Sequence, residues 1–261
     1  SGVVGNALNM FVLRDTKRRR AYFLFNGIAL SDILFFVVLM PSWLASYEIF
    51  AQDLIFRQIL FTVKVTCFGI ANWLSAINIW VVCVISLERY SAVHDPMKHK
   101  RMCGLANRHI LFAILIVTFI CTSYIHYNTH CKIKEICSGT QLAQVCVDVR
   151  ANWNSWRGMN TTPEWMRQLI GVMRYVHAGM AIAAPLILVC VFNGLLIHHA
   201  KRIGFSFDGS GTQTNLQRAE NRITYIAIVI ISVFLITNLP SAVILVFHTV
   251  YPFSYPDDSP K

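Results

Sequence analysis

Charged residues are scarce in this sequence. Asp, Glu, Lys and Arg make up 14% of its 261 residues, whereas a typical soluble domain has about a quarter. Hydrophobic residues make up 55%, and the mean hydropathy is +0.51. A soluble core of this size could not bury so much apolar surface, so the composition predicts a membrane protein.

Catalytic and metal-binding signatures are also missing. The eight cysteines form no CxxC pair of the kind that holds zinc. The apolar segments contain no HExxH motif, no paired carboxylates and no Ser/His/Asp set. We therefore expect a protein that is not an enzyme and that needs no organic cofactor.

Acidic residues are fewer than basic ones, 13 against 23, which gives a net charge of +10. A nucleic-acid-binding protein would spread its Lys and Arg over a folded surface. Here they gather in short blocks between apolar segments, at 14–20, 97–109 and 198–222. That distribution is typical of membrane proteins, so we expect a lipid bilayer as partner and no nucleic acid.

The apolar segments predict an all-α fold, a helical transmembrane bundle that forms one domain over residues 1–261. A helix needs about 20 apolar residues to cross a bilayer. We expect spans at 22–47, 56–93, 110–127, 169–198 and 223–247. Residues 1–13 are too few for a complete span and are predicted to be the second half of one.

The basic blocks also predict the orientation. The positive-inside rule places all three in the cytoplasm, so the amino-terminus is expected outside the cell. The polar segment 128–164 is then outside too, together with Cys131, Cys137 and Cys146 and with the glycosylation sequon at Asn160. The sequence therefore predicts a multi-pass plasma-membrane glycoprotein.

The polar segment alternates in the manner of β-strands at 131–136 and 141–149, and residues 138–140 form a turn sequence. This pattern predicts a β-hairpin. The alternative is a loose polar loop.

Asp32 lies in the middle of the second span. Ionisable groups in the hydrocarbon layer are costly and usually functional. We interpret Asp32 as a cation or proton site at the bundle centre, with Asn6 and Asn78 as its expected partners. The alternative is a hydrogen bond that only packs helices, and this is the favoured role for Asn6.

Arg89 ends the third span, and Glu220 opens the sixth at the same membrane depth. An ion pair between them could hold the bundle shut, although Arg89 could instead extend to the lipid headgroups. Pro185 and Pro240 lie inside spans, where each should kink its helix. Phe234, deeper on the sixth span, favours a hinge at Pro240.

These motifs follow one another in the order of a known family. Together they resemble the rhodopsin-like (class A) G-protein-coupled receptors, whose pattern is matched by Gly5-Asn6, Leu30-Ser31-Asp32, Glu88-Arg89-Tyr90 within 88–97, Pro185, and Phe234 with Pro240. The resemblance covers residues 1 to about 247 and implies a seven-helix receptor with helix 1 truncated and helix 7 missing.

The resemblance implies a mechanism as well. Arg89 would hold the resting state, paired with Glu220, and then contact a heterotrimeric G-protein. Phe234 and Pro240 would transmit an outward movement of the sixth helix. Asp32 would line an allosteric sodium site. The alternatives are a membrane transporter, which usually has several charged groups at mid-membrane, and a receptor fragment that does not signal.

Several positions depart from the family pattern. Asn238 stands where the sixth-span switch has an aromatic residue, Asn193 stands at the fifth-span Tyr position, and the fourth span has no Trp. Lys64 occupies the place of the family's third-span cysteine. The nearest cysteine is Cys67, and we expect it to bridge to Cys146 in the outer segment.

The ligand class follows from the same resemblance. Ala71 stands where amine receptors have Asp, so a biogenic amine is not expected. The predicted hairpin resembles those of peptide receptors, and the segments 27–32 and 237–240 are similar to those of invertebrate FMRFamide-like neuropeptide receptors. The expected partner is an extracellular peptide, with pocket candidates Ala71, Asn72, Ser75, His177, Asn238 and Ser241.

Overall fold

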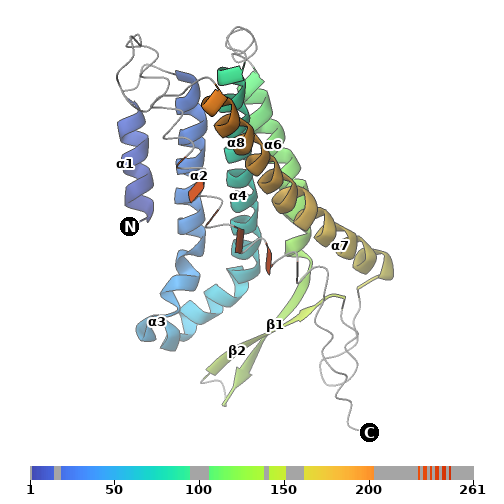
Figure 1. Cartoon of the computed structure of the whole chain (residues 1–261). Coiled ribbons are helices and arrows are strands. Elements are labelled where there is room, and N and C mark those ends of the chain that lie inside the picture. Colours follow the sequence, from blue (N-terminus) through green and yellow to red (C-terminus); the bar gives the residue numbers. More distant parts are fainter. Residues whose placement is uncertain are drawn as a thin grey trace. The chain divides into compact units, whose positions relative to one another are not determined.

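The computed structural model describes residues 2–14, 19–94, 106–137, 141–150 and 162–202, together with single positions between 229 and 247. This part of the chain consists mainly of helices and also contains one two-stranded sheet (Figure 1). The chain forms two compact units. The first comprises residues 1–81 and 102–174, and the second comprises residues 82–101 and 175–261.

Long apolar helices make up most of the described chain. Four stretches are long and apolar enough to cross a membrane: Phe23–Leu44, Leu54–Ala92, His109–His126 and Glu164–His198. In lipid the backbone must satisfy its own hydrogen bonds, which a helix does and an irregular segment does not. The predicted helical membrane fold is therefore confirmed.

The helices run somewhat differently from the predicted spans. Helix α1 covers Gly2–Arg14, and α2 covers Arg19–Leu44, so α2 begins and ends earlier than expected. Lys and Arg are good helix formers, which lets α2 start inside the basic block. A short helix, α3 (Glu48–Gln52), was not predicted.

Helix α4 covers Leu54–His94 and has 41 residues. At the rise of an α-helix it is about 60 Å long, roughly twice the hydrocarbon thickness of a bilayer. The helix is therefore longer than the apolar layer is thick, so part of it extends into regions where polar side chains are stable.

The first unit is held together by close helix contacts. Helix α1 packs on α2, where Gly2 leaves room for the Phe36 ring. Helix α6 (Ala106–Thr122) continues into the 3₁₀ turn η1 (Ser123–His126). The indole Nε1 of Trp73 on α4 donates to Thr118 Oγ1 at 3.1 Å, which connects α4 to α6.

A β-hairpin follows η1. Strand β1 (Thr129–Ile136) pairs antiparallel with β2 (Gln141–Asp148), from Thr129 opposite Asp148 to Ile136 opposite Gln141. The predicted hairpin is thus confirmed, and its turn at 138–140 lies outside the described residues.

In the fifth span, helix α7 (Glu164–Val176) leads through the π-helical segment η2 (His177–Ala183) into α8 (Ala184–Arg202). The π-helical turns end just before Pro185. A proline has no N–H and its ring crowds the carbonyl four residues back. A wider turn at that place accommodates both defects.

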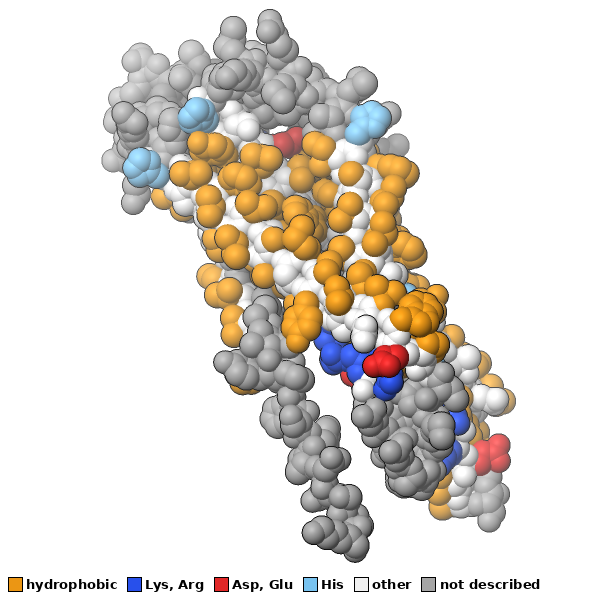
Figure 2. All heavy atoms as spheres, turned by 90° about the vertical axis from the view of Figure 1, so that its right-hand side faces the viewer, with side chains coloured by type: hydrophobic (Ala, Val, Ile, Leu, Met, Phe, Trp, Pro, Cys, Tyr) orange, Lys and Arg blue, Asp and Glu red, His pale blue; other side chains and the backbone are white. Residues whose placement is uncertain are grey.

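Large apolar side chains cover the outside of the helices. Figure 2 shows them over the face that includes α6 and α7. Phe112 and Ile120 on α6 and Trp165 and Val172 on α7 are among the exposed ones. A soluble protein keeps contiguous patches of this kind small, whereas lipid solvates them.

Candidate functional site

A polar cluster lies between α2 and α4 in the first unit. The Asn78 amide nitrogen donates to Asp32 Oδ1 at 2.6 Å, and the Ser31 hydroxyl donates to Asn78 Oδ1 at 2.6 Å. Ser31 is 6% exposed. Asn78 therefore uses its donor and its acceptor toward two neighbouring residues of α2.

Asn6 approaches the same carboxylate from α1. Its side chain is a hydrogen-bond partner of Asp32, and its Nδ2 also donates to the Gly2 carbonyl at 3.1 Å. The structure thus places both predicted partners around Asp32. Ser31, which the sequence analysis did not single out, completes the cluster.

The Glu88-Arg89-Tyr90 motif lies near the end of α4, in the second unit, and all three residues are half-buried. The Tyr90 ring stacks on Phe192 of α8 with centroids 6.3 Å apart, and it contacts the His94 ring at 5.4 Å. Tyr90 therefore fixes the end of the third span to the fifth span.

The predicted pocket residues fall into both units. Ala71 is buried on α4, whereas Asn72 and Ser75 are partly exposed. The Asn72 amide donates to the Phe68 carbonyl one turn back at 2.8 Å. His177 belongs to the second unit and is buried in the π-helical segment, at 4% exposure.

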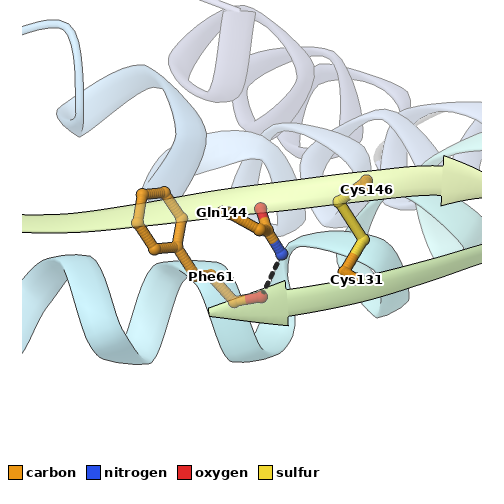
Figure 3. Close-up of a disulfide and its surroundings, with 4 residues drawn as sticks. All are labelled: Phe61, Cys131, Gln144 and Cys146. Carbon is orange, nitrogen blue, oxygen red and sulfur yellow. Dashed lines mark hydrogen bonds between the residues drawn. A yellow bond between two sulfur atoms is a disulfide. The ribbon is translucent and has the colours of Figure 1, made fainter. Parts of the chain in front are cut away.

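The predicted disulfide between Cys67 and Cys146 was wrong. Cys146 bonds to Cys131, directly opposite on the hairpin (Figure 3). Cys67 is a free thiol. The Cα atoms of the bonded pair are 4.0 Å apart. Antiparallel pairing brings Cys131 and Cys146 face to face, so the strand register supplies a nearer partner than the third span does.

The hairpin is attached to α4 by two hydrogen bonds. The Gln144 amide donates to the Phe61 carbonyl at 2.7 Å (Figure 3). The Arg57 guanidinium donates to the Leu142 carbonyl and lies over the Phe61 ring. The first turns of α4 therefore support β2 directly.

The other end of the hairpin is attached to α7. Arg174 Nη2 donates to Asp148 Oδ2 at 2.8 Å and to Asn128 Oδ1 at 2.9 Å. These bonds, with those of Arg57 and Gln144, hold a disulfide-closed sheet against two different spans.

The comparisons with known proteins agree with this architecture. A profile of the 7 transmembrane receptor (rhodopsin family) matches residues 5–260. The chain belongs to this receptor family. The family comprises receptors and not enzymes, so the expectation that the protein is not an enzyme is confirmed. Family membership and the apolar spans also make the receptor a multi-pass membrane protein.

One relative comes from Caenorhabditis elegans. It is the "Putative G-protein coupled receptor F59B2.13", 32% identical over 250 residues, and the match covers 92% of this chain. The chain spans 58% of the length of that relative.

Part of the predicted receptor machinery lies outside the described residues, namely Asn160, Glu220, Phe234, Asn238 and Ser241. Pro240 is described and is an exposed helical position, as are Ile236, Val243 and Phe247. The described positions of the predicted sixth span are thus helical.

Sequence reasoning missed the residues that anchor the hairpin: Arg57, Gln144, Asp148 and Arg174. One signal was present, since Arg174 is a charged residue within a predicted apolar span, as Asp32 is. Such a charge needs a partner, and the polar outer segment supplies Asn128 and Asp148.

Proposed function

We propose that this receptor binds an extracellular peptide and activates a heterotrimeric G-protein through outward movement of its sixth helix. The hairpin carries the peptide part of the proposal. It is closed by the Cys131–Cys146 bond and attached to α4 and α7. A fixed sheet of this kind offers backbone groups and side chains along its length, which suits an extended peptide.

The proposed orientation follows from the charge distribution. The basic blocks lie on the cytoplasmic side by the positive-inside rule. The amino-terminus, the hairpin and Asn160 are then extracellular, and the Glu88-Arg89-Tyr90 end of α4 faces the G-protein. Tyr90, stacked on Phe192, holds α4 and α8 together at that end.

Peptide recognition is tested with the full-length receptor and a co-expressed G-protein. We expect uptake of a GTP analogue to rise with peptides from a neuropeptide panel and not with biogenic amines, since Ala71 offers no carboxylate to an ammonium group. Silence across the whole panel, together with measurable solute flux through the protein, would contradict a receptor and favour a transporter.

Coupling is tested at Glu220. If Glu220 pairs with Arg89 at rest, Glu220→Ala releases the sixth helix and raises basal GTP-analogue uptake severalfold without any peptide. Glu164→Ala, at the start of α7 and on the predicted extracellular side, is the matched control and should leave the basal rate unchanged. An equal basal rate in the Glu220 variant and the wild type argues against the lock.

We also propose that Asp32 binds a sodium ion. The cluster supplies oxygen atoms from a carboxylate, a hydroxyl and an amide, in Asp32, Ser31 and Asn78. Oxygen donors are what hard cations prefer, so the residues fit such an ion. A bound cation would offset the Asp32 charge in the hydrocarbon layer.

A further inference from the structure

A charged cluster lies where β2 meets α7, in the first unit. Asp148 is its centre. One carboxylate oxygen, Oδ2, accepts from Arg174 Nη2 at 2.8 Å. The other, Oδ1, accepts the backbone N–H of Arg150 at 2.9 Å and lies 3.7 Å from the Nε atom of Arg150.

The cluster has more positive than negative charge. Two guanidinium groups, of Arg150 and Arg174, share the single carboxylate of Asp148. The side chains of Arg150, Arg174 and Asp148 are 29%, 23% and 36% exposed. Half-buried charges of this kind favour a partner of opposite sign, and among the described residues this arrangement leaves one positive charge in excess.

Arg150 is the incompletely bonded member. A guanidinium has five N–H donors. Its Nε atom is buried and has no hydrogen-bond partner among the described residues, because the 3.7 Å separation from Asp148 is too long for a hydrogen bond. Arg174, in contrast, already donates to Asp148 and to Asn128.

The neighbouring surface of α7 lies close to this side chain. Gly171 faces Arg150, and a Cβ atom placed on Gly171 would lie 3.9 Å from the Cδ and Nη1 atoms of Arg150. That distance is ordinary van der Waals contact, so Arg150 packs closely against α7 with no side chain of residue 171 between them.

We infer that Arg150, positioned by Asp148 beside Arg174, binds a carboxylate of the peptide ligand. Arginine pairs with carboxylates through two parallel N–H···O bonds. The Arg150 side chain is 29% exposed, so N–H groups of its guanidinium can meet such a carboxylate, which would cancel the excess charge. This inference rests on the proposed peptide function. The carboxylate belongs either to a free peptide C-terminus or to an Asp or Glu side chain.

The experiment compares three matched forms of each peptide that activates the wild-type, full-length receptor. The first is amidated with neutral side chains, the second is amidated with one Glu, and the third has a free C-terminus with neutral side chains. We expect the second or the third to be the most potent in GTP-analogue uptake, and the better form identifies the source of the carboxylate.

Arg150→Gln should raise the half-maximal concentration of the carboxylate-bearing form by about 10- to 100-fold and leave the neutral amidated form unchanged. Arg150→Lys keeps the charge but loses the planar fork, so it should give a smaller shift. It also serves if Arg150→Gln does not reach the cell surface.

Arg57→Gln is the matched control. It removes an arginine that holds the other end of β2, so it should affect all three peptide forms alike. Equal potency of the three forms, or an equal shift of all three in Arg150→Gln, overturns the carboxylate site while the peptide receptor stands. If no peptide activates the wild type, the proposed function fails, and the site fails with it.

Discussion

Asn78 sits between two polar side chains of α2 and bonds to both, at 2.6 Å in each case. Asn78→Leu would leave the Asp32 carboxylate and the Ser31 hydroxyl without this partner inside an apolar bundle. We expect the free energy of unfolding to fall by roughly 1–3 kcal/mol. The measurement is thermal denaturation of the purified receptor in detergent.

Asn72 provides the matched control on the same helix. Its amide donates to the Phe68 carbonyl of its own helix, so Asn72→Ala should change the stability by less than about 0.5 kcal/mol. Equal losses of stability in the two variants would show that the Asn78 bonds to α2 do not stabilise the receptor.

At the scale of elements, the disulfide connects the two strands of the hairpin. The Cys131–Cys146 bond closes a loop with a sequence separation of 15, and a loop of that size is stabilised by about 3 kcal/mol. Cys131→Ser and Cys146→Ser should therefore lower surface expression equally, and the double variant should lose no more. Flow cytometry of an epitope-tagged receptor measures this.

Cys67→Ser is the discriminating control for the hairpin. Cys67 is a free thiol in the third span, so its replacement should leave expression at the wild-type level. A loss equal to that of Cys146→Ser, with no further loss in the Cys67/Cys146 double variant, would restore the pairing predicted from the sequence.

The elements were largely predictable, and their contacts were less so. Long apolar runs predict membrane-spanning helices, and two segments of alternating polarity around a turn predict a hairpin. Local sequence patterns therefore determine both. The partner of Cys146 depends instead on strand register, which a family comparison does not give. The residues around Asp32 were predictable because charge in the hydrocarbon layer needs partners, whereas the bond from Arg57 to a backbone carbonyl leaves no mark in the sequence.

For the whole molecule, the orientation in the membrane is the property that most needs a test. If the hairpin side is extracellular, the sequon at Asn160 is glycosylated. Asn160→Gln should then remove the mobility shift that a peptide N-glycosidase produces on a denaturing gel.

Thr162 allows a control that leaves Asn160 in place. Thr162→Ser keeps the sequon and should keep the shift, whereas Thr162→Ala should abolish it. If none of the four forms carries a glycan, the wild type included, the result argues against the proposed orientation of the receptor in the membrane.

Trp73 has a consequence for how this receptor has diverged from its relatives. The family places a tryptophan on the fourth span, which has none here. The third span instead supplies the indole, which bonds to Thr118 and meets the Phe119 ring edge-on at 5.3 Å. The third and fourth spans are thus connected by an aromatic side chain that the third span supplies. Substitutions at 73 and 118 should consequently accompany each other across evolution.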